Sequence, residues 1–177
     1  MLAKILIALA LIVVVLLVVV ARQPATFRVA RTITISAPQE QVFAHVNDLH
    51  AWEAWSSWLK ADPAAKTAYE GAPAGTGAAF RWSGNKDVGE GRMTITESRP
   101  NDLVGLRLDF MRPFAGTSIA EFRFVPDGDR TVVTWSMIGD KNFLAKAIHL
   151  VIDMDKMVGG KFDEGLAQMK AVAEARK

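Results

Sequence analysis

Residues 142–175, NFLAKAIHLVIDMDKMVGGKFDEGLAQMKAVAEA, form a long amphipathic stretch at the end of the chain. Apolar side chains recur there at spacings of mostly three or four, which places them in one stripe along a helix: Phe143, Ala147, Leu150, Val151, Met154, Met157, Val158, Phe162, Leu166, Met169 and Val172. Asn142 is a residue type that caps helix starts. Gly159 and Gly160 each cost about 1 kcal/mol against alanine inside a helix. We therefore expect two helices, or one helix bent at this glycine pair, with the second part near 155–175. A stripe this long needs a broad apolar surface to lie on.

The preceding residues can supply that surface as a sheet. Between residues 66 and 139 the chain breaks into short alternating segments separated by turns, which predicts strands at 66–71, 77–83, 88–98, 103–112, 116–125 and 130–139. Residues 27–36 alternate in the same way and predict a first strand. Turns as short as Pro126–Asp129 join antiparallel neighbours, which commonly have one apolar face and one wetted face.

Two short helices are expected between the first strand and the others. Pro38 and Glu40 are typical of a helix start, and a second helix is predicted over 49–59 with three tryptophans on one broad face: Trp52, Trp55 and Trp58. These rings either pack over one end of the core or form an aromatic lid over a pocket. The fold class is α+β, with a curved seven-stranded antiparallel sheet around the C-terminal helix.

The front of the chain differs from the rest. Ile5 to Ala21 contains no charged or polar side chain, and Lys4 and Arg22 bracket it. About 20 apolar residues cross a bilayer core, so residues 1–21 are interpreted as an uncleaved single-pass membrane anchor, with contact to the bilayer through 2–21. A cleaved signal peptide is the alternative. Residues 22–26 are a linker and 27–177 one globular domain; the flanking charges do not decide its side of the membrane.

Composition argues against several classes of function. The net charge is only +2, so nucleic-acid binding is not indicated. The chain has no cysteine, which excludes disulfides and thiol catalysis. Its three histidines, at 45, 50 and 149, have no metal-ligand spacing. No cofactor and no metal are predicted.

Several short motifs resemble the START/Bet v 1-like (SRPBCC) superfamily, and within it the polyketide cyclase/dehydrase and lipid-transport group. They are Ile33-Thr34-Ile35-Ser36-Ala37-Pro38, Gln41-Val42-Phe43, Trp52-Glu53-Ala54-Trp55-Ser56, Val88-Gly89-Glu90-Gly91, Thr131-Val132-Val133-Thr134-Trp135 and Phe162-Asp163-Glu164-Gly165-Leu166. The resemblance covers about 27–176. It implies a helix-grip fold with an apolar cavity between the sheet and the last helix, and a hydrophobic small molecule as partner.

The residues that the resemblance places around this cavity are Trp82, Met93, Leu106, Phe110, Phe122, Trp135, Met137, Met154, Met157 and Phe162. Methionine and aromatic side chains adapt to irregular apolar guests, but the same residues also fill solid cores.

Glu97 shares the strand parity of Met93 and Ile95, so it is the one weak candidate for a catalytic carboxylate inside the cavity. Three hypotheses result: a membrane-anchored carrier or binding module for a lipid-like or aromatic molecule, a cyclase- or dehydratase-type enzyme using the same cavity, and a structural or regulatory domain with a filled core.

Overall fold

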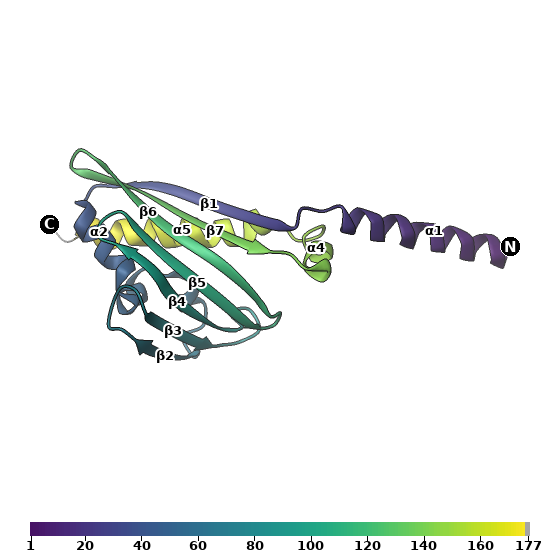
Figure 1. Cartoon of the computed structure of the whole chain (residues 1–177), viewed down its shortest axis with the longest axis horizontal. Coiled ribbons are helices and arrows are strands. Elements are labelled where there is room, and N and C mark those ends of the chain that lie inside the picture. Colours follow the sequence, from purple (N-terminus) through teal and green to yellow (C-terminus); the bar gives the residue numbers. More distant parts are fainter. Residues whose placement is uncertain (176–177) are drawn as a thin grey trace.

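Six of the strands pair with their neighbours in sequence order, and the first strand joins the sheet beside the last. The computed structural model describes residues 1–175 and contains one antiparallel sheet of order β1-β7-β6-β5-β4-β3-β2. Its strands are β1 Thr26–Ile35, β2 Lys66–Gly71, β3 Ala78–Ser83, β4 Glu90–Arg99, β5 Leu103–Arg112, β6 Gly116–Asp127 and β7 Arg130–Asp140. All seven predicted strands are confirmed, with shifted ends. Figure 1 shows the sheet twisted around the last helix, α5.

The segment between β1 and β2 forms α2 Gln39–Asn47, the 3-10 helix η1 Leu49–Ala54, and α3 Ser57–Ala61. The prediction of one helix over 49–59 is wrong. The backbone N–H groups of both Trp55 and Ser56 donate to the Trp52 carbonyl oxygen, at 3.2 and 2.7 Å. This tight turn ends η1, and Ser56 then adopts an extended conformation before α3 begins.

The C-terminal stretch is two helices, but they do not separate at the glycine pair. α4 spans Phe143–Ile148 and α5 spans Met154–Ala175, so Gly159 and Gly160 lie inside α5. Asn142 caps α4 by accepting from the Ala145 N–H at 2.8 Å, as its residue type predicted. The side chain of Asp153 accepts from the Lys156 N–H at 3.1 Å, which starts a new helix after the break at 149–153.

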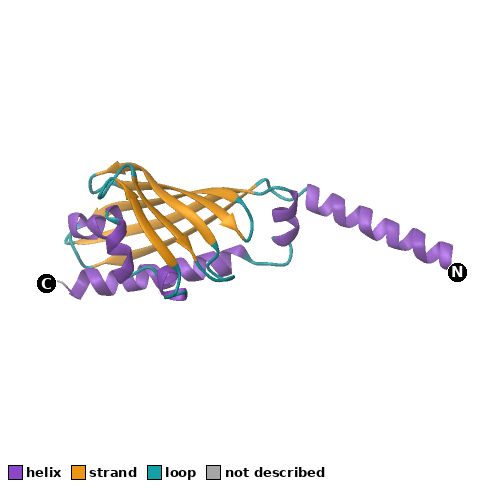
Figure 2. Ribbon diagram, turned by 90° about the horizontal axis from the view of Figure 1, so that it is seen from below, coloured by secondary structure: helices purple, strands orange, loops and turns teal. Residues whose placement is uncertain are grey.

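Of the two C-terminal helices, α5 is the one that lies along the sheet, as Figure 2 shows. Its buried residues Val158, Phe162, Leu166, Met169 and Ala173 recur every three or four positions and meet the inward-facing residues of the strands. α4 instead packs against the end of the N-terminal helix. Its Phe143, and Leu150 and Val151 after it, are exposed. The single stripe expected over 142–175 is therefore correct only for its second part.

The N-terminal helix α1, Leu2–Ala21, projects away from the sheet (Figure 1). It is long and apolar enough to cross a membrane, a description that a signal sequence also meets. Val20 is its one buried residue, with 3% of its surface exposed. The last turn of α1 is thus held against the domain, beside α4, while the rest of the helix stands clear.

Candidate ligand-binding site

Apolar side chains fill the interior between the sheet and α5, and some of them remain partly exposed at its margins. At the end of the sheet nearest α1, five apolar side chains remain partly exposed: Phe27, Trp82, Leu108, Phe110 and Met154. We call these five residues the half-open end. The strand register places them together on the α5 side, because Leu108 pairs with Ser118, Ser118 with Gly139, and Gly139 with Phe27. Phe110 pairs with Gly91, and Gly91 with Trp82.

Two glycines allow aromatic rings to lie directly on the strands at this end. A Cβ on Gly91 would come within 2.5 Å of the Trp82 ring, and one on Gly139 within 2.5 Å of the Phe27 ring. The Trp82 indole N–H also donates to the Val88 carbonyl oxygen at 3.2 Å. Because the Trp82 and Phe27 rings pack directly on the strand backbone, they form an apolar surface at the half-open end and have little freedom to move.

Deeper inside, an aromatic cluster fills the space between the sheet and α5. We use this name for Trp52, Trp55, Phe122, Trp135 and Phe162. The Trp135 ring stacks on Phe162 with centroids 3.8 Å apart and on Phe122 at 4.7 Å. The indoles of Trp52 and Trp55 donate to the carbonyl oxygens of Val46 and His45. Two of the three tryptophans at 52, 55 and 58 therefore pack in the core, as the first of their two interpretations predicted.

The Trp135 indole nitrogen is buried in this cluster and has no hydrogen-bond partner among residues 1–175. An unpaired buried donor of this kind costs about 1–3 kcal/mol. A polar group of this sort is unusual in a solid core, since most buried donors are paired.

Arg31 closes the β1 side of the interior. Its guanidinium pairs with Asp155 at 2.9 Å and with Asp163 at 3.0 Å, and it also donates to the Asp155 carbonyl oxygen. The hydrogen bond from Arg31 lowers the pKa of Asp155, while Asp155 and then Asp163 raise the pKa of Arg31. These contacts attach the first half of α5 to β1.

The opposite face of the sheet carries charge. Arg81 and Arg92 both pair with Glu70, Arg107 pairs with Asp109, and Arg123 pairs with Glu121. These ion pairs are largely exposed, so this face is wetted, as the strand alternation predicted.

The predicted cavity residues divide into three groups. Met93, Leu106, Phe122, Trp135, Met137 and Phe162 are buried in the core between the sheet and α5. Trp82, Phe110 and Met154 lie at the half-open end. Met157 is half exposed on α5, so the expectation that it faces the interior is wrong. Contact of any of these residues with a guest remains a prediction.

Two surface hollows occur at the edge of the sheet and not under α5. One of about 480 Å³ is lined by Gly84, Asn85, Lys86, Gly89, Arg112 and Pro113. The other, about 240 Å³, includes Trp82, Gly91 and Met111 in its lining. Neither is lined by a residue of α5. Buried side chains pack between the sheet and this helix, where a cavity was expected.

Glu97 does not face the interior. A register shift between Ile95 and Glu97 reverses the alternation of β4, because one extra residue turns every later side chain to the other face. The Glu97 carboxylate is 55% exposed and lies 3.5 Å from Arg99. Within residues 1–175, no aspartate or glutamate is buried.

The sequence-based selection missed Phe27, Leu108 and Arg31. A signal was present for each: Phe27 and Arg31 share the parity of Val29 on the first strand, and Leu108 lies between Leu106 and Phe110. A charged residue in an apolar row, such as Arg31, indicates a paired group on an opposing element.

Comparison with known proteins places the chain in a family. The sequence model for the family described as polyketide cyclase / dehydrase and lipid transport matches residues 26–174. The chain belongs to this family. None of the curated proteins matches it.

Solved structures with similar folds have little sequence in common with this chain. Protein CV1439 from Chromobacterium violaceum has a TM-score of 0.60 at 16% identity, covering 86% of this chain and 99% of its own. The di-domain ARO/CYC protein StfQ from the steffimycin biosynthetic pathway has a TM-score of 0.62 at 12% identity, over 86% of this chain and 52% of its own. Ara h 8.0201 has a TM-score of 0.55 at 9% identity, over 85% of this chain and 99% of its own. The fold is the Bet v 1-like helix-grip fold, as the resemblance implied.

Proposed function

We propose that this chain is a membrane-anchored protein that binds or transfers a hydrophobic small molecule, which enters at the half-open end. The observation that carries the proposal is the partial exposure of apolar side chains on the α5 side of the sheet, next to a buried aromatic cluster. Trp82, Leu108 and Phe110 stay partly exposed on the α5 side of the sheet, while the aromatic cluster closes the deeper part. Partly exposed apolar side chains around an apolar interior favour a guest that removes them from water.

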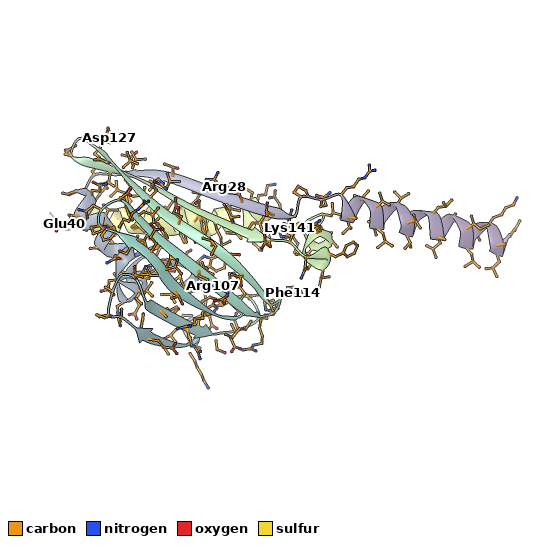
Figure 3. The ribbon with its side chains drawn as sticks, viewed as in Figure 1. Arg28, Glu40, Arg107, Phe114, Asp127 and Lys141 are labelled. Carbon is orange, nitrogen blue, oxygen red and sulfur yellow. The ribbon has the colours of Figure 1, made fainter. Side chains whose placement is uncertain are left out.

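The position of α1 supports the anchored form of this proposal. α1 meets the domain at the same end as the start of β1 and the turn between β5 and β6, where Phe114 lies (Figure 3). An anchor at this position brings the half-open end near the bilayer surface. A lipophilic guest then crosses little water, where exposed apolar area costs about 25 cal/mol per Å².

A charge placed at the half-open end tests the binding site. Phe110→Asp should weaken binding of a dansyl-labelled fatty acid by the full chain at least tenfold, equivalent to about 1.4 kcal/mol, because the carboxylate has to lose water when the guest enters. Energy transfer from tryptophan to the dansyl group measures the affinity, with the protein held in amphipol.

Ile119→Asp is the matched control, since Ile119 is an exposed residue on β6, a strand of the same sheet. Its affinity should stay within about twofold of the wild type, because an exposed position pays no desolvation cost. Equal affinities for both variants would remove the half-open end as the site. A wild-type chain that binds no lipophile, and carries none by mass spectrometry after gentle purification, would overturn the proposal itself.

A cyclase-type reaction on the bound guest is the second candidate. Family membership favours it, and so does the unpartnered Trp135 N–H, which would donate to a carbonyl oxygen of a guest. With Glu97 in solvent, no carboxylate is available as a base in the interior of the described chain. The Trp135→Phe variant tests this candidate. If its turnover of a polyketide-type substrate falls by a larger factor than its affinity for that substrate, an enzyme is favoured over a carrier.

A further inference from the structure

The segment from Phe143 to Ile152 exposes an unusual amount of apolar surface. It consists of α4 and the turn that leads to α5, and we call it the α4 segment. Phe143, Leu144, Leu150, Val151 and Ile152 are all exposed, with 87% of Val151 accessible. The first two residues of α4 and the three apolar residues of the turn after it thus have apolar side chains without a covering element.

This apolar surface is continuous with the end of α1. α4 packs against α1, and Val20 is buried at that contact. The Lys146 ammonium donates to the Ala21 carbonyl oxygen at 3.4 Å, where a cation favourably meets the C-terminus of a helix. The α4 segment is therefore held at the level where α1 leaves the apolar phase, and Figure 1 shows the two side by side.

The charge within the α4 segment is positive, and acidic residues stand outside it. The segment contains Lys146, Lys141 lies just before it, and Asp140 and Asp153 adjoin residues 141–152 at either end. Apolar side chains flanked by lysines are typical of elements that lie in the headgroup region of a bilayer. A second copy of this chain would place these lysines opposite the same lysines, which is unfavourable.

We propose that the α4 segment is a second membrane-binding element, which lies in the bilayer interface beside the exit of α1. This inference rests on the membrane anchoring proposed above. Contact at two places, a spanning helix and an interfacial segment, restricts rotation of the domain about a single tether. It also orients the sheet so that its half-open end stays against lipid, because α5 begins directly after the segment with Met154.

The absence of cysteine allows a depth measurement with single labels on the full chain. A bimane fluorophore is attached to Val151→Cys in the α4 segment, to Val125→Cys near the turn between β6 and β7, or to Val13→Cys in α1. All three positions are exposed. The protein is reconstituted in vesicles of phosphatidylcholine and phosphatidylglycerol that carry nitroxide lipids.

Nitroxide near the headgroups should roughly halve the fluorescence at position 151 and leave position 125 unchanged, since interfacial elements bury their apolar side only about 5–10 Å deep. Adding Leu144→Glu and Ile152→Glu to the Val151→Cys chain should abolish the quenching at 151. Both residues are exposed, so folding does not depend on them.

The label in α1 separates failure of the inference from failure of the proposed anchoring. Quenching at 13 by nitroxide near the chain ends, with none at 151, overturns the α4 inference and leaves the anchor in place. No quenching at 13 overturns both. A second copy of the chain could also cover this surface. In that case the label at 151 would be shielded from aqueous iodide but not quenched by nitroxide lipid, and the unlabelled Val151→Cys chain would form a disulfide-linked dimer. These two results together would also overturn the inference.

Discussion

Gly159 and Gly160 are neighbours on α5, yet a methyl group at each would meet different surroundings. A Cβ at Gly159 would overlap Nη2 of Arg31, whereas nothing lies within 4 Å of one at Gly160. Gly159 is thus the position at which the Arg31 guanidinium crosses the helix to reach Asp155 and Asp163. Of the two glycines that suggested a helix break in the sequence, Gly159 alone leaves room for the Arg31 side chain.

Alanine substitutions should separate these two glycines. Gly160→Ala should raise the free energy of unfolding by about 0.5–1 kcal/mol, because only the helix propensity changes. Gly159→Ala gains the same helix propensity, but its methyl group displaces the Arg31 side chain. It should therefore be the less stable of the two variants. Chemical denaturation in detergent gives the stabilities.

The pKa of Asp155, followed by NMR, provides an independent check on this explanation. Arg31 holds that pKa below its usual value, so Gly159→Ala should raise it and Gly160→Ala should not. An unchanged pKa in Gly159→Ala would contradict the role given to Arg31.

At the scale of the element, α4 packs against α1, and the residue after α4 contacts the first strand of the sheet. The His149 ring contacts Phe27 of β1 with centroids 5.4 Å apart. Burial, and secondarily the charge of Lys141, lower the pKa of His149. The imidazole is therefore neutral when α4 is docked near pH 7.

Acid should weaken this docking. The pKa of His149 is lower in the folded chain than in the unfolded chain. As the pH falls, the unfolded chain is therefore protonated at a higher pH than the folded chain. The free energy of unfolding should decrease as the pH drops below about 6.5. His149→Phe should show a smaller loss of unfolding midpoint between neutral and mildly acidic pH than the wild type. Thermal scans across that range measure it, and identical losses in the two proteins would refute the assignment.

Element types were predictable from sequence to the extent that local periodicity determines them. The seven strands follow from alternation and turns, and α5 follows from its three-and-four spacing. The split of 49–59 depends on a hydrogen-bond pattern around the Trp52 carbonyl. The orientation of Glu97 depends on a bulge in the pairing of β4 with β5. Neither leaves a local pattern in the residues concerned.

At the scale of the whole molecule, α1 contributes little to the stability of the domain. Val20 is its one buried residue, and one side-chain hydrogen bond, from Lys146, reaches its end. Removing residues 1–21 should therefore change the unfolding temperature by no more than about 5 °C, which for a domain of this size corresponds to roughly 1–2 kcal/mol.

Circular dichroism of residues 22–177 and of the full chain in the same mild detergent provides the comparison. Loss of cooperative unfolding in the shortened chain would show that α1 belongs to the core. The intact mass of the chain isolated from membranes tests the anchor directly, because a cleaved signal would lower it by the mass of the leader.

The sequence by itself determined the α+β class, the antiparallel sheet with its C-terminal helix, and the apolar α1, because each depends on periodicity or length within one segment. Tertiary structure alone decided that α4 leaves the sheet for α1, that Arg31 passes over Gly159, and that the interior is closed by aromatic rings but stays half open beside α1. These features depend on which distant side chains compete for the same space, and no single segment encodes that competition.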